Sequence, residues 1–186
     1  MDCDTKESGC SGAITDRVIG WIVENEVVDA SCYPYKAKKE VCHVSDCPAY
    51  HMKNDRVYSG SSATIDNIVK DLVDNGPLYF SMQVYSDLYS YKKGEVYVQS
   101  ASARRSGGHA VEVVGFGEIP EGDPARIDGD FATEHYWIIA NSWGVRFGDG
   151  GYFNIRMDQN IAYKAGTFDA DLDRRPVTTP FAQLFA

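Results

Sequence analysis

The sequence predicts an α+β fold with two lobes, in which a helical lobe comes first and a lobe of antiparallel strands follows. Two stretches, 13–24 and 61–77, repeat apolar residues at helical spacing, whereas strand-like runs dominate from residue 78 onward. The composition changes near residue 56, where a region rich in Cys, Pro and Lys ends. We therefore expect three parts: a first lobe over 1–56, a second lobe over 57–172 and an extended tail over 173–186.

The first predicted helix presents one apolar face. Ile14, Val18, Trp21 and Ile22 fall on the same side at helical spacing, and Asn25 can end the helix. Such a face needs a partner. If a neighbouring helix were missing from the first lobe, we would expect Trp21 and Ile22 to be bare unless the tail or another loop covered them.

The second predicted helix has the clearer signals. A Ser or Thr near 61–64 is available as an N-cap, and Asn-Gly-Pro at 75–77 ends the helix. Its apolar stripe consists of five residues: Ile65, Ile68, Val69, Leu72 and Val73.

Five strand-like runs follow, in which aromatic and β-branched residues alternate with polar ones. They are "LYFSMQVY", "EVYV", "HAVEVVGFG", "HYWIIAN" and "GYFNIRM". Glycine-bearing turns separate them, which predicts a small antiparallel barrel or half-barrel. We expect the tyrosines of "YSDLYSYKKGEVY" to form a wall of this barrel and the acidic segment 118–134 to be a solvated surface loop.

Charge and cysteine content narrow the function classes. The net charge is -9 and no cluster of Lys and Arg is present, so neither nucleic acid nor an anionic membrane is an expected partner. No apolar run approaches the roughly 20 residues that span a bilayer. Five cysteines, four of them within the first 42 residues, fit a lysosomal, vesicular or secreted protein better than a cytosolic one.

Several motifs carry a resemblance to a known family. "GGHAVEVVGFG", "YWIIANSWG" and "FGDGGYFNI" resemble the histidine and asparagine segments of papain-family cysteine peptidases, in the same order. "NGPLYFSMQVYSDLYSYKKGEVY" is similar to cathepsin B in particular, and "MDCDTKESGCSGA" resembles the region just after the helix that bears the nucleophile. The resemblance covers residues 1 to about 172. It implies a papain-like fold with a partial helical lobe and a β-barrel lobe.

The resemblance assigns catalytic roles to His109 and Asn141 and a shielding role to Trp143. A cysteine peptidase needs a thiolate, which a neighbouring imidazolium stabilises while a third group orients the ring. His109 matches the imidazole and Asn141 the orienting amide. Trp143 returns to the same side of an extended chain and can shield their hydrogen bond from water. The alternative is a satisfied polar pair in the core, without catalysis.

The nucleophile is the point at which the sequence departs from the family. The family's catalytic cysteine, and a glutamine before it, precede the region that resembles "MDCD". The resemblance therefore implies the C-terminal part of a cysteine endopeptidase that is not competent alone and needs an upstream segment bearing the thiol. The alternative is a non-catalytic relative that serves as a binding or structural module. Peptide or protein substrates are the implied partners, and no cofactor is implied.

The resemblance also implies how the cysteines pair. It places Cys3 with Cys42 and Cys32 with Cys47, and it leaves Cys10 unpaired. A zinc site built from Cys42, Cys47 and His51 is the alternative, although the spacing is irregular. We expect disulfides and no metal.

Four residues are expected to contact substrate by resemblance. Gly12 and Ala13 stand where the family has paired glycines, so a methyl group intrudes on the close approach of a substrate backbone. Gly108 precedes the histidine that the resemblance makes catalytic, and Gly166 or Thr167 lies nearest the floor of the main specificity pocket. Only nine residues, "YPYKAKKEV", separate Cys32 from Cys42, where cathepsin B has a long occluding loop. An open cleft, as in an endopeptidase, is the expected result.

Overall fold

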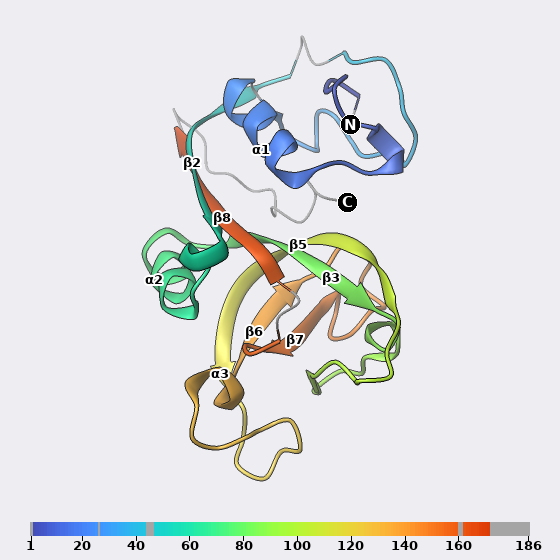
Figure 1. Cartoon of the computed structure of the whole chain (residues 1–186). Helices are drawn as coiled ribbons and strands as arrows, with labels where there is room; N and C mark the ends of the chain where they lie inside the picture. The colour runs from blue at the N-terminus through green and yellow to red at the C-terminus, as the bar shows by residue number, and fades with distance from the viewer. Residues whose placement is uncertain (1, 26, 44–46, 160–161, 172–186) are drawn as a thin grey trace. The chain divides into compact units, whose positions relative to one another are not determined.

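The computed structural model of the chain describes residues 2–25, 27–43, 47–159 and 162–171 (Figure 1). The chain divides into two compact units. The first comprises Met1–Arg56 and, among the described residues, 168–171; the second comprises Val57–Thr167. The division after Arg56 falls where the composition changes. Residues 168–171 belong to the first unit, whereas we had placed them in the second lobe. The expected tail, 173–186, lies outside the described residues.

The first unit contains a short 3-10 helix η1 (Gly9–Ser11), the helix α1 (Thr15–Glu24) and the strand pair formed by β1 (Val27–Val28) and the start of β2 (Ala49–Ser59). Asn25 ends α1 as expected: its backbone N–H and its side-chain Nδ2 both donate to the carbonyl oxygen of Trp21, at 2.9 and 2.8 Å.

The apolar face of α1 differs from the predicted one. Ile19 and Ile22 are buried, Trp21 is half-buried, and Ile14 is 52% exposed because it occupies the N-cap position. Ile22 is therefore covered, which is not the result expected if a neighbouring helix were missing, and Trp21 is covered only in part. The helix is turned so that residues at a spacing of three, rather than the full predicted stripe, point inward.

Two disulfides staple the first unit. Cys3 bonds Cys42 with a Cα–Cα distance of 4.8 Å, and Cys32 bonds Cys47 at 5.7 Å. Both pairs are the predicted ones, and Cys10 is free and exposed, as expected. Because Cys42 and Cys47 have no free thiol, the zinc alternative that needed both is wrong.

The second unit is built on a mixed sheet with the strand order β8-β3-β5-β6-β7-β4. Its strands are β3 (Leu78–Tyr85), β4 (Val96–Tyr97), β5 (Arg105–Glu118), β6 (His135–Ala140), β7 (Tyr152–Arg156) and the part of β8 (Ala162–Asp171) that ends at Thr167. Neighbours are antiparallel, except that β4 pairs with β7 in parallel. The purely antiparallel prediction is wrong at this edge. The chain passes through β5 and β6 before it forms β7, and this long connection allows β7 to run in the same direction as β4.

The helix α2 (Ile65–Asn75) follows a 3-10 turn, η2 (Gly60–Ser62), and begins and ends as the sequence predicts. The Thr64 side chain accepts a hydrogen bond from the backbone N–H of Asn67, and Gly76 takes a positive φ of 94° just after the last helical residue. Val73 is 69% exposed and does not join the stripe. The rest of the stripe packs on a core in which these residues are buried: Leu78, Phe80, Met82, Val111, Val113, Trp137, Ile139, Phe153 and Ile155.

The acidic segment 118–134 is more ordered than a solvated loop. Ile119 is fully buried, and the segment ends in a short helix, α3 (Phe131–Glu134). Arg126 forms ion pairs with three carboxylates of the segment, and Arg156 donates to the carbonyl oxygen of Ala125 at 2.7 Å. These two arginines hold the segment in place through its carboxylate and carbonyl oxygens, which its acidic composition alone does not predict.

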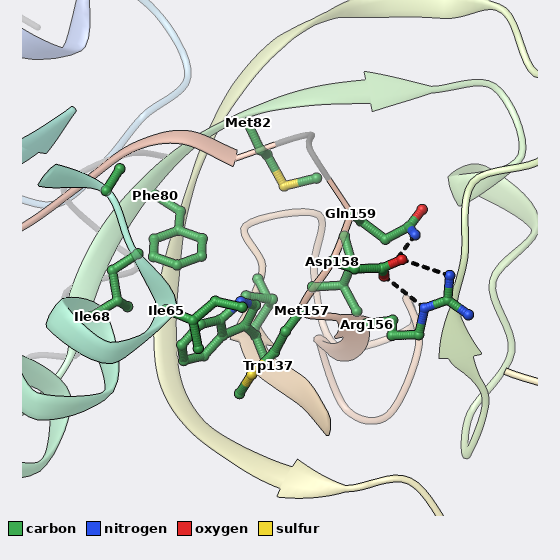
Figure 2. A pocket seen from close by; sticks show the side chains of 12 residues that line it. Ile65, Ile68, Phe80, Met82, Trp137, Arg156, Met157, Asp158 and Gln159 are labelled. Carbon is green, nitrogen blue, oxygen red and sulfur yellow. Dashed lines mark hydrogen bonds and ion pairs between the residues drawn. The ribbon is translucent and has the colours of Figure 1, made fainter. Parts of the chain in front are cut away.

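A cavity of about 270 Å³ lies beside α2, β3, β6 and β7 (Figure 2). Apolar side chains such as Phe80, Met82 and Trp137 line it, and Arg156 and Asp158 pair at its rim, with Nε–Oδ1 at 2.6 Å. His109, Asn141 and Trp143 do not line it. The cavity therefore belongs to the hydrophobic core rather than to the candidate catalytic group.

Candidate active site

Strand pairing brings His109 and Asn141 together although they are 32 residues apart. β5 and β6 are antiparallel neighbours, with Glu112 opposite Ala140. The start of β5 consequently lies beside the end of β6. His109 is three residues before Glu112, and Asn141 directly follows Ala140, so both side chains reach the same edge of the sheet.

A hydrogen bond joins the two side chains, with 2.8 Å between His109 Nε2 and Asn141 Oδ1. The backbone N–H of Ser142 donates to the same Oδ1 at 2.9 Å. Because a backbone N–H can only donate, the amide atom facing it must be the oxygen. That oxygen must then accept from His109, which places the ring proton on Nε2. Nδ1 of His109 is left as the ring nitrogen that can accept a proton.

Trp143 covers the pair as predicted. Its ring stacks on the imidazole of His109 with centroids 5.1 Å apart and planes inclined by 25°. Phe147 meets the indole edge-on at 4.9 Å, and Tyr89 stacks on it at 5.1 Å with planes inclined by only 19°. The imidazole of His109 thus joins a group of contacting aromatic rings formed by Trp143, Phe147 and Tyr89.

Burial lowers the pKa of His109 from its ordinary value near 6.5, and the hydrogen bond to Asn141 opposes this change in part. The charged form loses hydration when the ring is buried, so the neutral ring is favoured. A neutral imidazole with Nδ1 unprotonated is a proton acceptor near neutral pH. The arrangement therefore suits a general base.

The side-chain amide of Asn141 is only partly paired among the described residues. Its Nδ2 is buried and has no hydrogen-bond partner in the part of the chain that the structure describes. A buried unpaired donor costs about 1–3 kcal/mol. The described residues therefore leave one hydrogen-bond donor of the His109–Asn141 pair without an acceptor.

The other predicted residues lie in both units. Gly108 is exposed in β5, opposite Gln83 of β3 and next to His109. Gly12 follows η1 with a φ of 100°, a left-handed conformation that itself requires glycine, and Ala13 is exposed. Thr167 falls within β8.

The described residues contain no group of three or more His, Cys, Asp or Glu side chains placed to hold a metal ion. Within the same ranges, no helix is long and apolar enough to cross a bilayer.

Sequence reasoning missed two members of the site. Tyr89 was assigned to the barrel wall with its neighbouring tyrosines, yet it is 60% exposed and stacks on Trp143. The second is the backbone N–H of Ser142. The stack of Tyr89 on Trp143 joins residues far apart in the chain, so no local sequence pattern predicts it.

The model of the family described as "Papain family cysteine protease" matches residues 1–169. The chain belongs to the papain family of cysteine proteases. Cysteine proteinase 3 of Entamoeba histolytica is 33% identical over 162 residues, which are 86% of this chain and 48% of that protein. Cathepsin B-like CP3 of Giardia intestinalis is 33% identical over 164 residues, covering 83% of this chain and 50% of that protein.

A human relative in this family has a name that states no protease activity. Tubulointerstitial nephritis antigen-like is 27% identical over 190 residues, which cover 83% of this chain and 38% of that protein. The chain thus spans 38% to 50% of the length of these three relatives.

A solved structure shows that the fold is papain-like. "proCathepsin B S9 from Trypanosoma congolense" superposes with a TM-score of 0.74 at 24% identity, covering 91% of this chain and 58% of that one. The α+β prediction is confirmed. The papain-family and cathepsin B-like resemblance is confirmed by the family model and by the Giardia relative.

Proposed function

We propose that this chain supplies the imidazole and the orienting amide of a papain-type cysteine endopeptidase, whose thiol nucleophile comes from a segment outside the 186 residues. The observation that carries the proposal is the fixed group formed by His109, Asn141 and Trp143. His109 acts as the base, Asn141 orients the ring, and Trp143 excludes water.

The ring orientation suits each proton transfer. The thiol proton moves to Nδ1 of His109 while Nε2–H stays bonded to Asn141. The thiolate attacks the peptide carbonyl carbon, the C–N bond breaks, and the imidazolium returns its proton to the departing nitrogen. His109 then accepts a proton from the water that hydrolyses the thioester.

The lowered pKa of His109 is consistent with a site whose imidazole lies in this chain and whose thiol lies in another segment. It reflects burial without a nearby thiolate. A thiolate placed near Nδ1 raises the pKa of the imidazole, because opposite charges favour the charged form. The ion pair that the chemistry needs would therefore form only when the thiol-bearing segment is in place.

The cysteines of this chain support an external nucleophile. Four of the five are held in the two disulfides, which leaves Cys10 as the remaining thiol. Cys10 stands where the family resemblance places a structural half-cystine. We propose that it is not the nucleophile.

We propose unfolded peptides and proteins as substrates, cut at internal bonds in a lysosomal, vesicular or secreted setting. The nine residues between Cys32 and Cys42 are too few for an occluding loop. Within this proposal Gly12, Ala13, Gly108 and Thr167 contact the substrate.

The test is cleavage of an unfolded protein by the natural full-length protein under reducing conditions mild enough to spare the disulfides. We expect internal cleavage, and we expect His109→Ala to abolish it, because losing a catalytic group of this kind costs on the order of a million-fold. His43→Ala is the matched control, since His43 is exposed and its ring contacts the carbonyl oxygen of Val41 and the ring of Tyr33, not the candidate site. Equal activity of the His109→Ala variant would contradict the proposal.

The second candidate is a non-catalytic binding or structural module. The similarity to tubulointerstitial nephritis antigen-like, whose name states no protease activity, is the observation that favours it. A full-length protein that folds cooperatively, cleaves nothing and contains no reactive thiol besides Cys10 would support this candidate.

A further inference from the structure

Tyr89 is placed where it can control the aromatic cover of the imidazole. Trp143 stacks on both Tyr89 and His109, each at 5.1 Å. The indole of Trp143 is therefore the ring through which Tyr89 is linked to the imidazole of His109. Tyr89 is 60% exposed, so its stack on Trp143 lies at the surface.

The chain on either side of Tyr89 is anchored. Tyr89 is the middle residue of the 3-10 turn η3 (Leu88–Ser90), and Leu88 is fully buried in the core. Asp87, at the start of the turn, accepts from the hydroxyl of Tyr97 at 2.6 Å and from the backbone N–H of Ser100 at 2.8 Å. These contacts fix the turn and so fix where the ring of Tyr89 lies.

The residue after the turn ties it to the strand that follows the site. Tyr91 accepts a hydrogen bond from the backbone N–H of Asn154 at 3.1 Å, and its ring stacks on Phe147. Phe147 in turn meets the edge of Trp143. The indole is therefore held on one face by Tyr89 and at its edge by Phe147, and both contacts trace back to the same anchored turn.

We propose that Tyr89 is a positioning residue for His109: its ring holds the indole of Trp143 against the imidazole and keeps water away from the hydrogen bond between His109 and Asn141. A stacked aromatic pair contributes about 0.5–1.5 kcal/mol beyond the area that it buries, so the ring of Tyr89 stabilises the position of the indole. The inference rests on the proposed function only for the catalytic use of His109. The stacking itself can be tested without any substrate.

The test is solvent exchange of the His109 Nε2 proton, followed by NMR in the natural full-length protein and assigned by its absence in His109→Ala. Tyr89→Ala should speed exchange by about 2- to 12-fold, the factor that corresponds to the contribution of one aromatic pair. Tyr89→Phe keeps the ring and should stay close to the wild-type rate. Tyr35→Ala removes a tyrosine that is 57% exposed in the first unit and should change nothing.

Two further readouts keep the test decisive. In protein whose free thiols are alkylated, Tyr89→Ala should raise the pKa of His109 toward its ordinary value, because the burial that lowers it would be relieved. Tyr89→Leu preserves apolar bulk without a stacking face, and it should resemble Tyr89→Ala if stacking is the cause. Unchanged exchange in a folded Tyr89→Ala variant, or equal acceleration in Tyr89→Phe, would overturn the inference. A protein that cleaves nothing but shows the expected exchange pattern would refute the proposed function alone.

Discussion

Replacing Asn141 by leucine tests whether this side chain serves the candidate site or the stability of the fold. The substitution keeps the approximate size of the side chain but removes an acceptor of two hydrogen bonds and an unpaired buried donor. Both lost bonds are part-buried, so each is worth about 0.5–1.5 kcal/mol, or about 1–3 kcal/mol together. Removing the unpaired Nδ2 returns about 1–3 kcal/mol. The free energy of unfolding should therefore change by less than about 2 kcal/mol in either direction.

Urea unfolding of the natural full-length protein measures this change, and NMR measures exchange of the His109 Nε2 proton. We expect little loss of stability but much faster exchange, because the acceptor that orients the ring is gone. Asn141→Asp retains an acceptor oxygen and should keep exchange slow. A loss of more than about 4 kcal/mol on Asn141→Leu would refute the reasoning, since the pair would then be a structural element of the core.

Two other predictions concern the disulfides and pH. Replacing both cysteines of the Cys3–Cys42 pair by alanine should lower the free energy of unfolding by about 4 kcal/mol, and the same change in the Cys32–Cys47 pair should lower it by about 3 kcal/mol. The difference arises because the two disulfides close segments with sequence separations of 39 and 15 residues. Equal midpoints of urea unfolding for the two variants would contradict this loop-length argument. In protein whose free thiols are alkylated, the unfolded chain binds the imidazole proton more readily than the folded chain, because burial lowers the pKa of His109. The stability held above pH about 6.5 should decline as the pH falls toward the folded-state pKa, and His109→Ala should flatten this part of the profile; identical profiles would show that His109 is not the group responsible.

The sequence predicted the parts of the fold that local pattern controls. The Thr64 cap and Gly76 mark the ends of α2, and "LYFSMQVY" coincides with β3. Which residues of a helix face inward depends on packing partners that the local pattern does not contain. Ile14 and Val73 are therefore exposed despite apolar side chains.

The predicted part of the candidate site came from motif order, and the unpredicted part from long-range contacts. "GGHA" and "NSWG" resemble the family's segments, so His109, Asn141 and Trp143 could be named before their geometry was known. The stack of Tyr89 on Trp143 and the bond from Arg156 to the carbonyl oxygen of Ala125 join residues far apart in sequence. Such contacts appear only once the strand order is fixed.

The rate of thiol alkylation as a function of pH tests the central claim most directly. A thiolate paired with the imidazolium of His109 reacts well below the ordinary thiol pKa of about 8.5, and the thiol of an unstructured cysteine peptide serves as the reference. We predict that the natural full-length protein contains one thiol that is alkylated rapidly at mildly acidic pH, and that His109→Ala returns this thiol to ordinary pH dependence while His43→Ala does not. Alkylation confined to Cys10 with an ordinary pH dependence, or a fast thiol that is indifferent to His109→Ala, would contradict the account.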